Sequence, residues 1–345
     1  MTVSLRKTRS RAPLRLGLAG GGTDLSPYCD LHEGAVLNVT IDRFAFATLT
    51  PRDDNRIVFV ANDLDTRIEH GLEDDLSSSP LLLHRGVYER MIRDHHGGKR
   101  CALTITTSVD APLGSGLGSS SALVVALVDA FREMLRAPLG QYDVARLAYE
   151  IERVELRLAG GRQDQYAAAF GDINFIEFLR NDRVLVNPLR LHGAIRRELE
   201  SSLIVCFTGS SRESARIIEQ QTGALNAGNS VAMDAMHALK ATAVEMKQCL
   251  FLGDIVGMAD LLNQAWRAKK ATASGIATQR IDELFEFALA NGALGGKVSG
   301  AGGGGFMFFL VEPDERFRLI EKLQNQGARA EPVKFHAYGC ETWQP

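Results

Sequence analysis

A glycine-spaced loop constrains this chain more than any other stretch. It reads Pro112-Leu113-Gly114-Ser115-Gly116-Leu117-Gly118-Ser119-Ser120-Ser121-Ala122. Residues 102–109 before it alternate between apolar and polar types, which predicts a half-buried strand. Residues 122–135 after it are mostly apolar and contain neither Gly nor Pro, which favours a helix with Ser119 or Ser120 at its N-cap.

This loop suits a polyphosphate. Glycines let backbone N–H groups turn towards a ligand, and the positive end of the following helix attracts an anion. For a glycine loop taken alone, the alternative is a turn that only links two elements. The loop is not a Walker motif, because no Gly-Lys-Ser/Thr follows Gly118, and Ser119 replaces the third glycine of the dinucleotide-binding pattern.

Residues 11–24 read R-A-P-L-R-L-G-L-A-G-G-G-T-D and predict a strand that ends in a glycine turn. Leu14 and Leu16 share one face of that strand, so Arg15 points the other way. Asp24 suits a polar site, or equally the N-cap of a following helix.

Two later segments also combine glycines with charged residues. Residues 143–158 predict an amphipathic helix, on which Glu152 is either functional or part of a water-facing surface. This helix leads to Gly160-Gly161-Arg162-Gln163-Asp164-Gln165, where Asp164 begins another helix. Residues 297–305, K-V-S-G-A-G-G-G-G, predict either a close approach of the backbone to a partner or a mobile loop.

The length of 345 residues favours two domains, or one large domain. Residues 191–200 are polar and charged, and we expect them to link an N-terminal domain, residues 1–195, to a C-terminal domain, residues 196–345. Residues 63–79 are polar and acidic and are expected to loop outwards.

Charge and cysteine content limit the partners and the compartment. The net charge of −3 provides no bulk attraction for nucleic acid or an anionic membrane, and the basic N-terminal cluster, apart from Arg15, is expected to be a solvated arm. Five scattered cysteines without a C-x-x-C spacing predict free thiols in a reducing compartment. No apolar stretch is long enough to span a membrane, and the basic start lacks the apolar segment of a signal peptide, so we expect a cytoplasmic protein.

Taken in order, the four glycine-containing segments resemble those of the GHMP family of small-molecule kinases, which is named for galactokinase, homoserine kinase, mevalonate kinase and phosphomevalonate kinase. The resemblance spans residues 11–305. Within the family the chain is most similar to the sugar-1-kinases that act on D-glycero-D-manno-heptose 7-phosphate, which share A-G-G-G-T-D-L, G-G-x-Q-D-Q and T-G-x-S-R-x-S. Galactokinases typically carry G-E-H-T-D where this chain has residues 20–24, G-G-G-T-D, which argues against galactose.

The resemblance implies an α+β, two-domain GHMP kinase fold, with an N-terminal half like ribosomal protein S5 domain 2 and a ferredoxin-like C-terminal half. It also implies ATP-dependent phosphorylation of the anomeric C1 hydroxyl of the heptose 7-phosphate to the 1,7-bisphosphate, for nucleotide-heptose and surface polysaccharide synthesis. The alternatives are the same chemistry on fucose, galacturonate or mannose, or a non-catalytic protein of this fold that binds a metabolite or a protein partner. The expected partners are a sugar phosphate and ATP, and a homodimer is left open.

The family also implies roles for individual residues. Asp164 would orient or deprotonate the acceptor hydroxyl, and Arg15 would pair with Asp164 and with the transferring phosphate. Ser120 and Glu152 would hold Mg²⁺. The residues expected to bind ATP are Pro112, Gly114, Ser115, Gly116, Leu117, Gly118, Ser119, Ser120 and Ser121. The residues expected to bind the sugar phosphate are Gly22, Thr23, Asp24, Gly161, Asp164, Arg212, Gly302 and Gly303.

The remote phosphate of such a substrate needs a cation. Arg212, near a predicted helix start, is the first candidate, and Lys269 and Lys270 are the next. For each of the three, an exposed surface charge is the alternative.

Overall fold

The long strand β2, Gly34–Pro51, is the centre of an eight-stranded sheet. The computed structural model describes residues 5–112, 114–209 and 214–345. β2 pairs antiparallel with β1 (Thr8–Ala19), β5 (Leu103–Val109) and β6 (Ile173–Phe178). The main strand order is β12-β1-β2-β5-β3-β4, and β6 joins β7 to the far part of β2. The other strands of this sheet are β3 (Arg56–Ala61), β4 (Thr66–Gly71), β7 (Val184–Pro188) and β12 (Glu341–Trp343).

A second sheet has the order β11-β8-β10-β9. Its strands are β8 (Leu203–Phe207), β9 (Ala293–Val298), β10 (Phe306–Val311) and β11 (Arg329–Pro332). Along β10, Phe306 and Phe308 face a core that is continuous with the larger sheet, whereas Met307 and Phe309 face a separate core. Because both faces of β10 are buried, its sequence is an uninterrupted apolar run.

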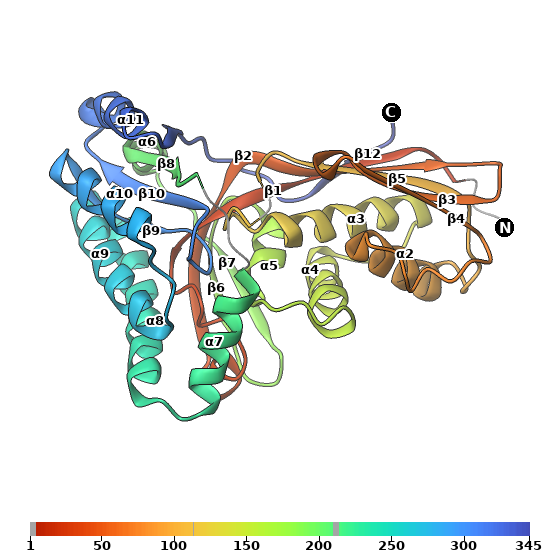
Figure 1. Cartoon of the computed structure of the whole chain (residues 1–345), viewed down its shortest axis with the longest axis horizontal. Helices are drawn as coiled ribbons and strands as arrows, with labels where there is room; N and C mark the ends of the chain where they lie inside the picture. Colours follow the sequence, from red (N-terminus) through yellow and green to blue (C-terminus); the bar gives the residue numbers. More distant parts are fainter. Residues whose placement is uncertain (1–4, 113, 210–213) are drawn as a thin grey trace.

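Helices cover one face of the larger sheet and surround the second sheet (Figure 1). Those below the larger sheet are α2 (Leu82–His95), α3 (Ser119–Leu135), α4 (Gln141–Tyr149) and α5 (Gln163–Phe170). Those around the second sheet are α6 (Gly193–Ser202), α9 (Ile255–Thr272), α10 (Gln279–Ala290) and α11 (Arg316–Asn325), while α8 (Ser230–Leu252) packs beside α9 and against β1 and β2. The helix α7 (Ser214–Asn226) lies between the two groups in this view, and α1 (Tyr28–His32) follows β1.

The strand predicted before the glycine loop is confirmed, as is the helix after the loop. The N-cap of this helix, α3, differs from the expectation. Gly118, with φ of 76°, takes that position, and no side chain caps the helix. Ser119 and Ser120 are instead its first two residues.

Four other expectations of local structure were wrong or held only in part. Residues 63–79 contain the strand β4, which lies at the sheet edge and carries charged residues, as edge strands often do. The basic N-terminal residues 9–11 belong to β1, where Arg11 is held by Glu341 of β12 at 2.7 Å. The expected linker 191–200 is largely the helix α6. The expected helix 143–158 changes after α4 into a π-helical turn, Glu150–Glu155.

The two sheets share one hydrophobic core, to which β8, β10 and α8 contribute together with the larger sheet. The C-terminal strand β12 also returns to pair with β1. The boundary between residues 195 and 196 therefore stays a prediction.

Candidate active site

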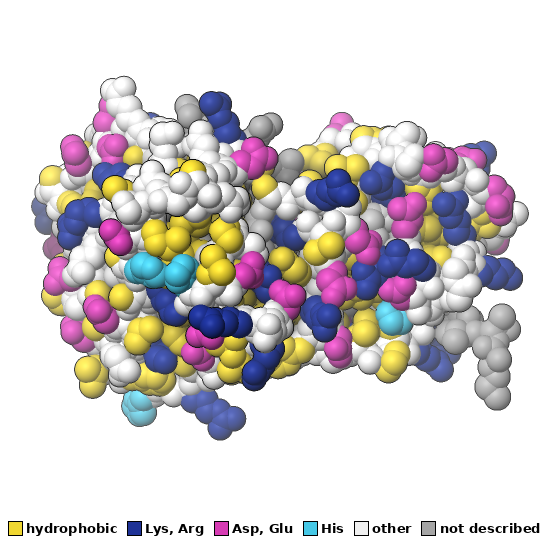
Figure 2. All heavy atoms as spheres, turned by 90° about the horizontal axis from the view of Figure 1, so that it is seen from below, with side chains coloured by type: hydrophobic (Ala, Val, Ile, Leu, Met, Phe, Trp, Pro, Cys, Tyr) yellow, Lys and Arg dark blue, Asp and Glu magenta, His cyan; other side chains and the backbone are white. Residues whose placement is uncertain are grey.

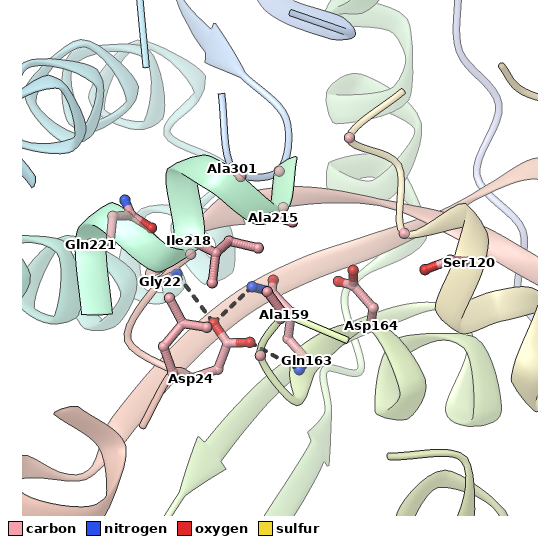
Figure 3. Close-up of a pocket in the computed structure, with 18 of the residues that line it drawn as sticks. Gly22, Asp24, Ser120, Ala159, Gln163, Asp164, Ala215, Ile218, Gln221 and Ala301 are labelled. Atoms are coloured by element: carbon pink, nitrogen blue, oxygen red, sulfur yellow. Dashed lines mark hydrogen bonds between the residues drawn. The ribbon is translucent and has the colours of Figure 1, made fainter. Parts of the chain in front are cut away.

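A cavity of about 690 Å³ lies where the four glycine-containing segments meet. Figure 3 shows Asp164 and Ser120 at one end of this cavity, Asp24 near its middle, and Ile218 and Gln221 of α7 at the other end. Segments that are far apart in the sequence therefore form a single site.

Buried Arg15 and partly buried Asp164 form an ion pair at the first of these ends. Nε and Nη2 of Arg15 each lie 2.7 Å from Oδ1 of Asp164. Nη1 of Arg15 donates to the carbonyl oxygen of Gly116 at 2.6 Å and to Oγ of Ser299 at 3.2 Å. One guanidinium thus joins β1, the start of α5 and both glycine loops, and it fixes the orientation of the Asp164 carboxylate.

Glu152 lies inside the molecule because of the π-helical turn. The N–H of Leu156 donates to the carbonyl oxygen of Ile151, five residues earlier, and this wider turn accompanies the complete burial of Glu152 (0% exposed). Oε1 of Glu152 accepts from Ser120 Oγ at 2.7 Å, and Oε2 accepts from Ser121 Oγ and Gln165 Nε2, both at 2.7 Å. The water-facing alternative is therefore wrong for Glu152.

Glu150 and Glu155, in contrast, lie nearer the surface, where both pair with Arg90. In the π-helical turn, Glu152 therefore faces inwards while Glu150 and Glu155 stay near the surface.

Arg153 is a site residue that the sequence did not single out. Nη1 of Arg153 donates to the carbonyl oxygen of Ala159 at 3.1 Å and lies 3.3 Å from Oε1 of Glu152, while Nη2 donates to Ser121 Oγ at 3.1 Å. Arg153 also lines the cavity. In sequence it resembled one of several surface charges on an amphipathic helix, so no local signal distinguished it.

Asp24 is held from two sides. Oδ1 of Asp24 accepts from Gly22 N at 3.1 Å and from Gln163 Nε2 at 2.9 Å, and Oδ2 accepts from Gln163 N at 3.1 Å. The helix-cap alternative is wrong, because Pro27 occupies the N-cap position of α1. A carboxylate accepts about four hydrogen bonds, so Asp24 keeps capacity for a ligand hydroxyl.

Gly161 is required by this arrangement, because a Cβ atom there would overlap Oδ2 of Asp24. Gln163 belongs to the same hexapeptide, 160–165, as Gly161 and Asp164. The sequence predicted this motif as part of the site, but it did not predict that Gln163 holds Asp24 or that Gln165 holds Glu152.

The two glycine loops pack backbone to backbone. A Cβ atom on Gly116 would overlap the carbonyl oxygen of Ser299, and the N–H of Phe306 donates to the carbonyl oxygen of Ser115 at 2.8 Å. The mobile-loop alternative for residues 297–305 is therefore not supported. Gly302 and Gly303 lie against Ile276, to whose carbonyl oxygen the Gly303 N–H donates at 2.7 Å, and Gly300 and Ala301 line the cavity instead.

Of the other residues predicted to bind ATP or the sugar phosphate, some line the cavity and some do not. Those that line the cavity are Arg15, Gly22, Asp24, Gly114, Gly116, Gly118, Ser119, Ser120, Gly161 and Asp164. Thr23, Ser115, Leu117 and Ser121 are buried behind the lining, Pro112 is exposed, and Arg212 lies outside the described residues.

Two buried lysines also reach the cavity. Lys269 of α9 donates to the carbonyl oxygen of Gly21 at 3.2 Å, and Lys297 of β9 donates to that of Gly17 at 2.8 Å. Burial lowers the pKa of Lys269 to about 8, with Arg15 adding to the effect and Asp24 opposing it. Burial likewise lowers the pKa of Lys297 to about 7, assisted by the charges of Lys269 and Arg15. Lys297 was missed, although it begins the last glycine segment.

Residues 83–172 match the family model described as GHMP kinases N terminal domain, and residues 235–329 match GHMP kinases C terminal. The chain belongs to the GHMP kinase family, as the resemblance of its glycine segments predicted. It has the two-domain GHMP kinase fold with mixed α and β content, and members of this family are ATP-dependent kinases.

Two relatives that match over nearly the full chain are named as heptose phosphate kinases. The chain is 42% identical to the D-glycero-alpha-D-manno-heptose 7-phosphate kinase of Campylobacter jejuni, over 98% of this chain and 99% of that protein. It is 41% identical to a crystal structure of a D-glycero-D-manno-heptose 1-phosphate kinase from Bacteroides thetaiotaomicron, with a TM-score of 0.83 and coverage of 98% and 99%. A mevalonate kinase structure from Methanococcus jannaschii, at 16% identity, shares the fold with a TM-score of 0.76, over 97% of this chain and all of that one.

Other expectations concern the surface. None of the helices in the described ranges is long and apolar enough to cross a membrane. On the face drawn in Figure 2, basic and acidic side chains are intermixed. The five cysteines are free thiols, as expected.

Proposed function

We propose that this protein transfers the γ-phosphoryl group of ATP to the anomeric C1 hydroxyl of D-glycero-D-manno-heptose 7-phosphate. The products are the 1,7-bisphosphate and ADP. The observation that carries this proposal is the Arg15–Asp164 pair, which lies between the glycine loop and the polar group around Asp24. The names of the two relatives that are more than 40% identical support a heptose phosphate as the substrate.

In this mechanism Asp164 receives the proton of the acceptor hydroxyl. The C1 oxygen forms a bond to the γ-phosphorus, the bond from that phosphorus to the β,γ-bridging oxygen breaks, and ADP leaves with the electron pair. Arg15 keeps Oδ1 of Asp164 occupied, which leaves Oδ2 for the hydroxyl. Because the transition state is loose and the proton leaves late, Asp164 acts first by orienting the hydroxyl.

Ser120 and Glu152 have the chemistry of a Mg²⁺ site. Both offer hard oxygen donors, and Ser120 lines the cavity beside the glycine loop. Mg²⁺ is usually held by one or two carboxylates together with phosphate oxygens, so this pair fits the ion. The ion would neutralise charge that develops on the transferring phosphoryl group. Arg153 and Gln165 then keep the Glu152 carboxylate in position.

Asp24, supported by Gln163 and Gly161, binds hydroxyl groups of the sugar. The product feeds nucleotide-activated heptose for surface polysaccharide, and both ATP and reduced thiols are typical of the cytoplasm. The homodimer stays a prediction.

A coupled ADP-release assay on a panel of sugars tests this proposal. The panel contains heptose 7-phosphate, the phosphate-free heptose, fucose, galacturonate and mannose. We expect the highest kcat/KM with heptose 7-phosphate and a new C1 phosphate signal in the ³¹P NMR spectrum of the product. Faster turnover of a phosphate-free hexose would contradict the proposal, and the absence of ADP release with every sugar would favour a non-catalytic role.

A further inference from the structure

The cavity has a cation beside Gly22, on a different wall from the glycine loop. Figure 3 shows Gly22 and Gln221 on the side of Asp24 that faces away from Asp164 and Ser120. Lys269 lies beside Gly22, because a Cβ atom on Gly22 would be 3.6 Å from its Nζ atom, and the charges of Arg15 and Lys297 are close enough to interact with it. The helix α9 thus brings an ammonium group to a place that the glycine loop does not occupy.

Among the described residues, no carboxylate is hydrogen-bonded to the ammonium group of Lys269. The residue is only 5% exposed, and of its three N–H donors one bonds to the carbonyl oxygen of Gly21. The carboxylate that acts on it electrostatically is Asp24, whose oxygens accept from Gly22 and Gln163. Within the described residues, no ion pair involves Lys269. A buried cation is costly unless an anion pairs with it, so this position favours an anionic ligand.

Gln221 of α7 adds an unsatisfied acceptor at the same end. Its Nε2 donates to Thr272 Oγ1 at 2.6 Å, and Thr272 Oγ1 donates to the carbonyl oxygen of Lys269 at 2.8 Å. These bonds fix the direction of the amide. Oε1 of Gln221 is buried and has no partner in the described part of the chain, and Figure 3 shows it turned towards Ile218. A buried acceptor of this kind suits a hydroxyl donor.

The two features together match one end of the proposed substrate. C7 of the heptose carries a phosphate, and the neighbouring C6 carries a hydroxyl, so an anion and a hydroxyl donor lie side by side. With C1 at Asp164, the opposite end of the sugar extends past Asp24. We propose that Lys269 binds the 7-phosphate and that Gln221 accepts a hydrogen bond from the adjacent hydroxyl, an inference that rests on the proposed function.

This assignment gives different roles to the neighbouring lysines, because they bond to different segments. Lys297 bonds to Gly17 on the strand that carries Arg15, near the reacting end of the cavity. Lys270 is partly exposed and lies 3.3 Å from Asp282, so it serves as a matched control on the same helix.

Isothermal titration calorimetry with heptose 7-phosphate and with the phosphate-free heptose tests the inference on the full-length protein. We expect Lys269→Met to raise the Kd for heptose 7-phosphate by about 10- to 100-fold, because a hydrogen bond to a charged group is lost. The Kd for phosphate-free heptose should change by less than about 3-fold, since that sugar makes no contact with the ammonium. Lys270→Met should leave both constants unchanged, whereas Gln221→Leu should weaken both sugars to a similar extent because both carry the hydroxyl.

An equal loss for both sugars in Lys269→Met would overturn the inference and give Lys269 a structural role. An unchanged Kd for heptose 7-phosphate would overturn it too. The ratio of the two constants does not depend on the folded fraction of the variant. If the wild-type protein neither binds nor phosphorylates heptose 7-phosphate, the proposed function itself fails, and this result is seen before any variant is made.

Discussion

Nε and Nη2 of Arg15 both reach the same oxygen of Asp164, Oδ1, at 2.7 Å. The second oxygen, Oδ2, makes no hydrogen bond to any residue within the described ranges. The guanidinium therefore holds the carboxylate from one side and leaves the other oxygen beside the cavity. A carboxylate that orients a hydroxyl group and then accepts its proton needs one free oxygen, and this asymmetry provides it.

Asp164→Asn keeps the shape of this side chain and removes the proton acceptor. We expect kcat to fall by about 10²- to 10⁴-fold, the usual contribution of a positioned acid or base. The KM for ATP should change little, because the glycine loop is untouched. Steady-state ADP release measures both constants. Asp282→Asn, which alters a partly exposed carboxylate paired with Lys270, is the control, and an unchanged kcat in Asp164→Asn would refute the catalytic role.

Glu152→Gln removes the negative charge from the proposed metal site. We expect the Mg²⁺ concentration for half-maximal activity to rise by at least about 10-fold. Activity measured against free Mg²⁺ at saturating ATP checks this. Glu155→Gln is a matched control, because Glu155 lies in the same π-helical turn but pairs with Arg90 and Arg93 nearer the surface. Equal Mg²⁺ requirements in the two variants would exclude Glu152 as a ligand.

Gly161→Ala places a methyl group where Oδ2 of Asp24 lies. We expect the KM for the sugar to rise by about 10-fold or more, because a small displacement of a positioning group is costly. The KM for ATP should stay the same. In Gly223→Ala the new methyl group meets no described atom within 4 Å outside the backbone of its own helix, so this variant should keep the sugar KM of the wild type. A wild-type sugar KM in Gly161→Ala would show that Asp24 does not contact the sugar.

Lys297 makes stability depend on pH in a predictable direction. Its folded-state pKa of about 7 lies below the usual value of 10.5, so between these values the unfolded chain binds more protons than the folded chain. The contribution of Lys297 to the free energy of unfolding therefore rises with pH across this window, and below about pH 7 the cost of burying its charge is fully present. Lys269 and Arg15, the neighbouring cations, act in the same direction on its pKa.

Lys297→Met removes this titration. Relative to the wild type, the variant should gain more stability at pH 6 than at pH 9, as measured by urea unfolding. A difference between the two proteins that stays constant with pH would contradict the prediction.

Phe308 tests the core that the two sheets share. It is fully buried (0% exposed), and Phe308→Ala should lower the free energy of unfolding by about 3–5 kcal/mol. Phe317, 65% exposed on α11, is the control, and its replacement by Ala should change stability by less than about 0.5 kcal/mol. A single cooperative urea transition, shifted for the whole chain, is expected in Phe308→Ala. Loss of structure limited to the second sheet would show that the sheets unfold independently.

Local patterns succeeded where one segment carries the whole signal. The glycine loop between β5 and α3 was recognisable because strand alternation, glycine spacing and helix periodicity all lie within residues 102–135. The edge strand β4 was missed because its charged residues resemble a loop, and only pairing with β3 makes it a strand. The burial of Glu152 could not be predicted locally either, because its sequence pattern predicts a regular helix rather than a π-helical turn.

By itself, the sequence determined the chemical parts of this protein: the glycine loop, the candidate acid–base residue, the family and its ATP-dependent chemistry. These depend on residue types at short spacings within a segment, and the family on the order of four such segments along the chain. The tertiary structure alone decided which groups meet. Arg15 and Asp164 are 149 positions apart, Lys269 and Gly21 are 248 apart, and no local pattern encodes a contact across such distances. Packing of the two sheets around one core brings these groups together, and that packing is a property of the whole chain.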